Sequence, residues 1–399
     1  MLVDLPTELL RDIFIRASPG FASTLRALML TCKRFHHIVE EHLYPEYNLR
    51  TADNQYELLT DFVRRPHLRP LVRSLDIKQD AYPERRPRSQ NEVTELMAQT
   101  PLPQDYSVLG SLSKDLERDS NDAVPALLVT LLPRIERLRY TIGDKLQPYK
   151  TATNSDLMFL LDKAGELPSP NHATLSSLFT SLSLIHISIN AEYRVNTRGT
   201  FMAITSLRKV YLKGVIWRYL SGFWECGLRA SPVENLNVDS LRINALHGNR
   251  RVFESFIALK RLRLDLRRID LAQNVSSDPI PKLVQVLEAT QKDSLETLEL
   301  YINWPPGPEE SDEYRYVDGS SITSLKKFTR LRNLTLPDVI LCGTPPHDFD
   351  HHAEPPTWTL QFLDDMLPAS LEHLTHVVYE AHVGGESSWR RVWGGLNPG

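Results

Sequence analysis

The chain has 399 residues, of which 41% are apolar, 8% aromatic and 24% charged, and this is the composition of a globular protein. Its 46 Lys and Arg against 50 Asp and Glu give a formal net charge of −4, which disfavours a general affinity for nucleic-acid phosphates. The three cysteines, Cys32, Cys226 and Cys342, form no C-x-x-C pair, so the sequence predicts neither a zinc site nor a disulfide framework and favours a reducing compartment.

The sequence also indicates where the protein acts. No apolar run approaches the length of about 18 residues that a membrane-spanning helix needs. The first residues are acidic rather than basic and lead directly into Pro6, unlike a signal peptide. We therefore expect no membrane partner, no nucleic-acid partner and a cytoplasmic or nuclear location.

The first predicted helix lies in DLPTELLRDIF, residues 4–14. Pro6 suits the first helical turn because an N–H at that position has no intrahelical partner, and Glu8 is favourable at the positive end of the helix dipole. Apolar residues then recur at i, i+1, i+4 and i+5, namely Leu9, Leu10, Ile13 and Phe14. Ser18-Pro19-Gly20 ends this helix.

A second helical stretch runs from Thr24 to Tyr44, with apolar residues at three- and four-residue steps, and ends at Pro45. Two or three short helices in roughly 40 residues bury too little surface to be stable alone. They must pack either on the rest of the chain or on another protein. Periodicity by itself leaves both possibilities open.

This segment, over about residues 2–47, resembles an F-box, the short helical module that binds a Skp-type adaptor in ubiquitin ligases. The matching positions are Leu5, Pro6, Glu8, Leu9, Leu10, Ile13, Phe14, Leu28, Leu30, Cys32, Lys33, Arg34 and Phe35. Thr31 stands where valine is common, and Phe35 stands where tryptophan is frequent. The resemblance implies a Skp-type adaptor as partner and, through it, a cullin. It also implies a set of adaptor-binding residues: Leu5, Pro6, Leu9, Leu10, Ile13, Phe14, Leu28, Cys32 and Phe35.

Beyond residue 70 a short pattern recurs as VRSLDI (72–77), IERLRY (135–140), FTSLSL (179–184), LRKVYL (207–212), VENLNV (233–238), LKRLRL (259–264), LETLEL (295–300) and LRNLTL (331–336). The fourth residue of each, the anchor, is apolar, as are the residues three before it and two after it. Fifteen of the sixteen residues directly beside the anchors are polar. This alternation predicts half-buried strands, because successive side chains of a strand point to opposite faces of the sheet.

Helical segments are predicted between the strands: Ala123–Leu132, Asp156–Ala164, Trp217–Trp224, Arg250–Ile257, Pro281–Gln291 and Thr359–Met366. Anchor spacings of 26 and 28 residues fall in the range of leucine-rich repeats, and the longer spacings indicate insertions. A degenerate ninth unit, residues 370–380, is predicted to supply the closing strand.

The body of the chain thus resembles the irregular leucine-rich repeats that follow F-boxes in fungi. The predicted fold class is α/β, with a small all-α F-box followed by an irregular leucine-rich-repeat solenoid, in which a curved parallel sheet carries helices on its convex side. The alternative is an ordinary α/β domain, but its strands would be buried on both faces and would lack the polar alternation.

The predicted domains are the F-box module at 1–48, the repeat region at 49–383 and a flexible tail at 384–399. Polar or proline-rich stretches at about 79–122, 304–319 and 342–358 are predicted insertions.

Outward-facing strand residues would line the concave face of such an array, where a target could bind. These candidate target-binding residues are Arg137, Arg139, Lys209, Tyr211, Arg261, Arg263 and Glu299. Their predominantly basic character suggests a target with an acidic or phosphorylated segment, which arginine can bind through two parallel hydrogen bonds.

No motif for catalysis is present: the chain has no phosphate-binding glycine loop, G-x-S-x-G elbow or H-E-x-x-H helix. We expect no catalytic residues and no cofactor. The group His347, Asp348, Asp350, His351 and His352 lies between prolines without helical spacing, so we expect no metal site there. The basic runs at 64–70 and 84–88 lack interleaved aromatic residues and are expected to be solvated.

These observations support the interpretation that the chain is a non-catalytic substrate-recognition subunit of a Skp–cullin–F-box ubiquitin ligase. The alternative is a leucine-rich-repeat scaffold whose N-terminal helices cap the repeats and which has no ligase role.

Overall fold

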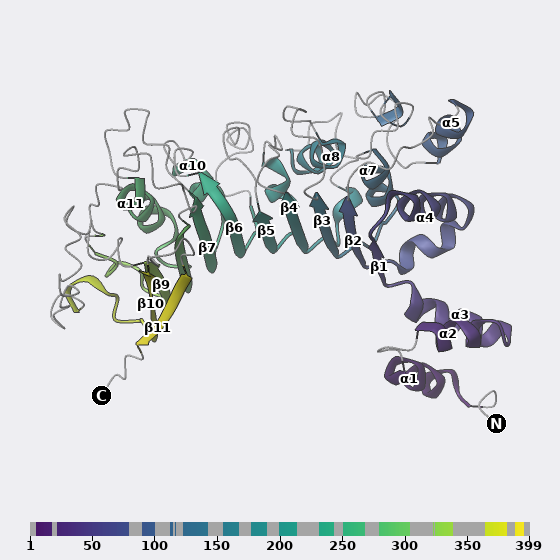
Figure 1. The fold of residues 1–399 in the computed structure, drawn as a ribbon, viewed down its shortest axis with the longest axis horizontal. Coiled ribbons are helices and arrows are strands. Elements are labelled where there is room, and N and C mark those ends of the chain that lie inside the picture. Colours follow the sequence, from purple (N-terminus) through teal and green to yellow (C-terminus); the bar gives the residue numbers. More distant parts are fainter. Residues whose placement is uncertain are drawn as a thin grey trace. The chain divides into compact units, whose positions relative to one another are not determined.

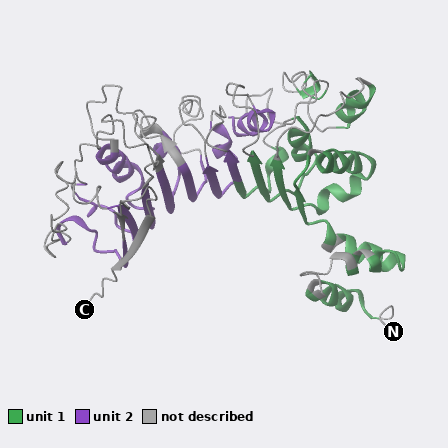
Figure 2. Ribbon diagram, viewed as in Figure 1, with its two compact units in different colours: residues 1–147, 168–185 green, residues 148–167, 186–399 purple. Residues whose placement is uncertain are grey.

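The computed structural model describes residues 5–17, 22–79, 90–99, 112–114, 116, 123–142, 155–166, 177–189, 199–213, 231–242, 250–267, 279–303, 322, 324–337, 364–380 and 388–394. The chain divides into two compact units, shown in green and purple in Figure 2. Unit 1 comprises Met1–Gln147 and Pro168–Ile185, and unit 2 comprises Pro148–Leu167 and His186–Gly399.

Unit 1 begins with three helices and continues with parallel strands. In chain order its elements are α1 (Thr7–Ala17), α2 (Ala22–Met29), α3 (Lys33–Leu43), β1 (Glu46–Leu49), α4 (Ala52–Arg64), the 3-10 helix η2 (Pro66–Leu71), β2 (Ser74–Gln79), α5 (Gln90–Ala98), α7 (Ala123–Thr130), β3 (Arg137–Ile142) and the 3-10 helix η3 (Ser177–Phe179). Strands β1, β2 and β3 pair in parallel, and helices α4 and α7 pack together.

Unit 2 contains a series of strands that recur along the chain, and its helices lie on one side of these strands (Figure 1). Its elements are α8 (Asp156–Gly165), the 3-10 helix η4 (Thr200–Ala203), β5 (Lys209–Lys213), β6 (Asn235–Arg242), α10 (Arg250–Ser255), β7 (Arg261–Arg267), α11 (Pro279–Gln291), β8 (Thr297–Asn303), β9 (Asn333–Pro337), β10 (His373–Glu380) and β11 (Ser388–Gly394). Strands β5 to β10 pair in parallel in chain order, and β11 pairs antiparallel with β10. Strand β4 (Leu184–Ile189) contains residues of both units.

The alternation of inward and outward side chains shows where the core of unit 2 lies. The anchors Leu236, Leu262, Leu298 and Leu334 lie opposite one another in the sheet register, and each is at most 1% exposed. The residues beside these anchors alternate to the other face, where Arg261 is exposed and Arg263 partly exposed. The mixed α/β class is therefore confirmed, whereas the curved solenoid stays a prediction.

A backbone interaction recurs at the start of the strands. The carbonyl two residues before an anchor accepts hydrogen bonds from two consecutive N–H groups of the next repeat, at 2.7–3.1 Å. For example, Glu234 O accepts from the N–H groups of Lys260 and Arg261. The carbonyls that do so are those of Arg73 and Glu136 in unit 1, and Arg208, Glu234, Lys260, Glu296 and Arg332 in unit 2; Pro45 O plays the same part before β2. We call these the strand-start carbonyls.

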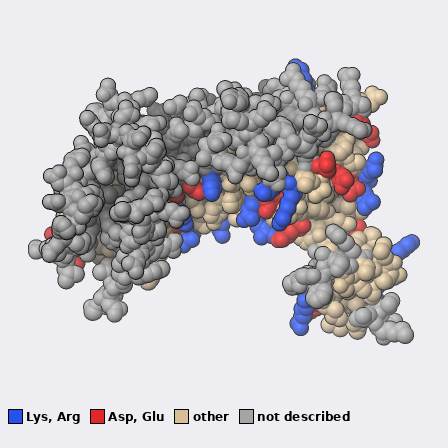
Figure 3. All heavy atoms as spheres, viewed as in Figure 1, with Lys and Arg blue, Asp and Glu red and all other residues tan. Residues whose placement is uncertain are grey.

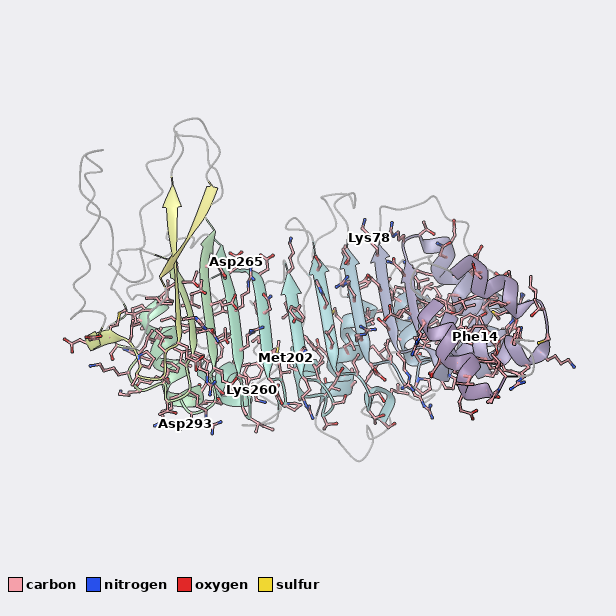
Figure 4. The ribbon with its side chains drawn as sticks, turned by 90° about the horizontal axis from the view of Figure 1, so that it is seen from below. Phe14, Lys78, Met202, Lys260, Asp265 and Asp293 are labelled. Carbon is pink, nitrogen blue, oxygen red and sulfur yellow. The ribbon has the colours of Figure 1, made fainter. Side chains whose placement is uncertain are left out.

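The side chains of the unit 2 residues among these alternate in charge, in the order Arg208, Glu234, Lys260, Glu296 and Arg332, and Glu372 at the equivalent position before β10 continues the alternation. We call this series the charge ladder. Lys260 Nζ lies 2.8 Å from a Glu234 carboxylate oxygen, and Arg332 Nη1 lies 3.4 Å from one of Glu372. The hydrogen bond and the negative charge of Glu234 raise the pKa of Lys260. Figure 4 shows Lys260 and Asp265 at opposite ends of β7, so this charge ladder runs along one edge of the sheet.

One predicted strand is displaced by three residues. FTSLSL (179–184) was expected to be a strand, but the structure has η3 ending at Phe179 and β4 beginning only at Leu184. Ser183 and Leu184 donate to the Glu136 carbonyl, which makes Ile185 the structural anchor, not Leu182. Both FTSLSL (179–184) and LSLIHI (182–187) have the apolar spacing of the pattern. The prediction chose the wrong one of the two because Leu184, directly before the true anchor, is apolar where the pattern has a polar residue.

Several other elements were not predicted from the sequence. β1 and α4 were not predicted; α5, with Val93 and Leu96 buried, lies in the stretch expected to be an insertion; and β11 lies in the predicted flexible tail. The predicted closing strand is followed by that further strand. The predicted helix Trp217–Trp224, the stretches 304–319 and 342–358 and most of Thr359–Met366 lie outside the described residues.

A buried glutamine joins α10, α11 and the start of β7. The Gln291 side chain, 2% exposed, donates through Nε2 to Phe253 O (2.7 Å) and Phe256 O (3.2 Å), and its Oε1 accepts from the Leu259 N–H (3.1 Å). One buried side chain thereby makes hydrogen bonds to three main-chain groups.

Replacing Gln291 with methionine keeps the volume but removes these three hydrogen bonds to the main chain of buried residues. We expect the free energy of unfolding to fall by about 2–4 kcal/mol, since each of the three lost hydrogen bonds contributes about 0.5–1.5 kcal/mol. Urea denaturation of the full chain measures this. The exposed Gln285 on the same helix provides the control, because Gln285→Met should change stability by no more than about 0.5 kcal/mol. Equal effects at the two positions would contradict the assignment.

Candidate functional site

The three N-terminal helices form a small core of their own. The buried residues of this core are Leu10, Phe14, Leu25, Phe35, Ile38 and Val39. The rings of Phe14 and Phe35 meet edge to face with centroids 5.6 Å apart. Arg34 on α3 ties down the start of α1, because its Nη2 donates to Leu5 O (2.7 Å) and Thr7 Oγ1 (3.1 Å). We call residues 5–44 of this arrangement the helical module.

Helix α1 carries two apolar stripes rather than one. Leu10 and Phe14, four residues apart, face the core of the module and are 0% and 3% exposed. Leu9 and Ile13 are also four residues apart, but they are 49% and 40% exposed. Residues at i and i+4 are neighbours on a helix surface, so Leu9 and Ile13 form a continuous apolar strip open to solvent.

The turn between α2 and α3 adds a further exposed apolar side chain. Leu30 is 88% exposed. Its N–H donates to Ala27 O, and the next residue, Thr31, donates from both its N–H (3.0 Å) and its Oγ1 (2.7 Å) to Leu28 O. This bonding fixes the turn and keeps Leu30 out of the core. Leu9, Ile13 and Leu30 are three of the four large apolar residues that are exposed in the described part of the chain; Ile257 is the other.

The nine predicted adaptor-binding residues therefore fall into three groups. Leu10, Phe14 and Phe35 are inside the module and are inaccessible to a partner while the helices stay packed. Leu5, Leu28 and Cys32 are partly buried against that core. Pro6, Leu9 and Ile13 are exposed. Leu30 was absent from the predicted set, although its place in the F-box pattern was a usable signal.

The module is connected to the following repeats by polar and aromatic contacts in unit 1. The Glu40 carboxylate on α3 lies 3.1 Å from His36 Nε2 and 3.9 Å from His67 Nε2 on η2. Tyr47 on β1 stacks on Tyr44 and meets Phe62 of α4 edge to face, with centroids 6.0 and 5.8 Å apart.

The candidate target-binding residues lie on the sheet faces of two different units. In unit 1, Arg137 pairs with Glu46 and Arg139 lies 3.4 Å from Asp76, so both cations already have acidic partners. Figure 3 shows such basic and acidic side chains intermixed where this surface is visible.

In unit 2 the candidates differ from one another. Arg263 lies 3.7 Å from a Glu299 carboxylate oxygen and 4.7 Å from the centre of the Tyr301 ring, and Tyr211 stacks on His186 at 5.7 Å. Lys209 and Arg261 are exposed, and neither has an acidic side chain within ion-pair distance among the described residues.

Among known protein families, the F-box-like family model matches residues 2–50. The chain therefore carries an F-box-like domain at its N-terminus, and F-box domains generally bind Skp-type adaptors and are typically non-catalytic. No curated protein matches the chain.

Among the described residues, no helix is long and apolar enough to span a membrane. In the same part of the chain no three His, Cys, Asp or Glu side chains are grouped as metal ligands would be. The segment His347–His352 lies outside the described residues.

Substitutions at neighbouring positions of α1 should differ in their effect on the stability of the helical module, because they lie in different stripes. Phe14→Ala should destabilise the helical module by about 3–5 kcal/mol, because it leaves a cavity beside Phe35. Ile13→Ser should leave its stability nearly unchanged, because Ile13 is already partly in water. Hydrogen exchange of the α1–α3 amides in the full chain measures both effects. Faster exchange in Ile13→Ser than in Phe14→Ala would show that the two stripes are exchanged.

Proposed function

We propose that this protein is a substrate-recognition subunit of a Skp–cullin–F-box ubiquitin ligase. The observation that carries the proposal is the apolar strip of Leu9 and Ile13, together with Leu30, which stays in water on an F-box-like domain whose core is already complete. Burying each of these side chains against a partner would contribute about 1.5–3 kcal/mol if burial were complete.

In this proposal the helical module binds a Skp-type adaptor and, through it, a cullin. Leu9, Ile13, Leu30 and Pro6 make the direct contacts, and Leu5, Leu28 and Cys32 border them. The buried Leu10, Phe14 and Phe35 act indirectly, because they hold α1 in the orientation that exposes Leu9 and Ile13.

The repeats, proposed to be leucine-rich, would hold the target. Unit 2 supports this role because one face of its strands is free of the described helices and carries polar and aromatic side chains (Figure 4). The protein would form or break no covalent bond. It would raise the effective concentration of the target near the ubiquitin-carrying enzyme.

Adaptor capture tests the proposal directly. Ile13→Asp and Leu30→Asp should each weaken binding to a purified Skp-type adaptor by at least about tenfold, because each places a charge where an apolar side chain would be buried. Calorimetry or quantitative co-precipitation measures the loss.

Ile257 provides the matched control, because it is 58% exposed but lies in unit 2. Ile257→Asp should capture the adaptor as the wild type does. Equal capture by wild type and Ile13→Asp would contradict the proposal and favour a repeat scaffold without a ligase role.

A further inference from the structure

The open face of the unit 2 sheet carries a transverse row that contains cations and no acids. Strand register places Lys209, Asn235, Arg261, Thr297 and Asn333 opposite one another, one residue from each of β5 to β9. We call these five residues the first row. Its formal charge is +2, from Lys209 and Arg261.

The cations of the first row are not neutralised by their neighbours in the row. Lys209 and Arg261 are two strands apart, with the neutral Asn235 between them, and Thr297 follows Arg261. Asn333 Nδ2 donates a hydrogen bond to Thr297 Oγ1 at 3.4 Å. Both residues are neutral, so this end of the row adds no negative charge. The equivalent position of β3 in unit 1 is different, because Arg137 there is paired with Glu46.

The acidic side chains nearest in register are already paired with other cations. Glu234 pairs with Lys260 at the strand start, Asp239 lies 3.7 Å from Lys213, and Glu299 lies 3.7 Å from Arg263. Aromatic rings lie further along the same strands: Tyr211, two residues after Lys209, is stacked on His186, and Arg263, two residues after Arg261, lies over the ring of Tyr301. The face thus combines two available cations, amide donors and planar surfaces.

We propose that this face binds an extended segment rich in Asp and Glu, with its carboxylates on Lys209 and Arg261. The inference deepens the proposed function and rests on it for the role of that segment as part of a target. Neighbouring strands are about 4.8 Å apart, so the two cations are separated by about 10 Å at the backbone. Two carboxylates on one side of an extended chain are about 7 Å apart, and the long Lys and Arg side chains can make up the difference from about 10 Å. A single phosphate, by contrast, concentrates its charge at one point and would not reach both cations.

The test uses the full chain and a labelled peptide of roughly 12 residues in which Asp and Gly alternate, a length that crosses the face when extended. Fluorescence anisotropy should show binding that weakens when salt is raised from about 0.05 to 0.15 M, and a matched Asn–Gly peptide should not bind. The double substitution Lys209→Gln with Arg261→Gln should weaken binding by about tenfold.

Arg137→Gln with Arg139→Gln is the control, because it removes the same charge from paired positions in unit 1 and should change binding by less than about twofold. Equal losses in the two double variants would overturn the proposal in favour of general charge attraction. A wild-type chain that ignores the Asp–Gly peptide, or that binds only a neutral peptide carrying one phosphoserine, would overturn it as well.

Adaptor capture by the same proteins separates this inference from the proposed function. Lys209→Gln with Arg261→Gln should capture the Skp-type adaptor normally. Absence of peptide binding with normal capture by the wild type would remove the acidic-segment site alone. Failure of the wild type to capture the adaptor would remove the ligase role and leave the acidic-segment site as a property of the repeats.

Discussion

The fold of the repeats depends on the strand-start carbonyl, a single main-chain oxygen that accepts two consecutive N–H groups of the next repeat. Because main-chain atoms make these bonds, they are available to any sequence without proline at the two donor positions. They fix where each strand begins relative to the one before it. Once that register is fixed, anchors such as Leu262 and Leu298 fall opposite one another, and a continuous apolar layer follows.

The sequence was sufficient to predict most of this arrangement, because apolar and polar residues alternate strictly in the repeats of unit 2. It failed at β4, where two overlapping triplets, ending at Leu184 and at Ile187, have the same apolar spacing. Only the hydrogen bonds from Ser183 and Leu184 to Glu136 distinguish them, and these bonds join residues 47 and 48 positions apart. Strands β1 and β11 were missed because their pairing partners, not their own patterns, make them strands.

The candidate sites were predictable to different extents. The F-box pattern identified the helical module, but a list of matching apolar residues cannot separate the exposed Leu9 and Ile13 from the buried Leu10 and Phe14. The two pairs differ by one position, which turns a side chain by about 100° around the helix axis. On the sheet face, the sequence pattern predicted the same target-binding role for Arg137 and Arg261. Their difference comes from a partner 91 residues away, Glu46, that reaches Arg137 across the sheet, and no local pattern contains that information.

The charge ladder of unit 2 has a consequence for how such a protein can change in length during evolution. Its signs alternate from Arg208 to Glu372, so the chemical period is two repeats although the structural period is one. Loss or duplication of a single repeat would set like charges side by side along that edge, whereas loss or duplication of a pair would keep every neighbour opposite in sign. Descendants of this chain should therefore gain and lose repeats two at a time, or else acquire a compensating charge reversal at the junction.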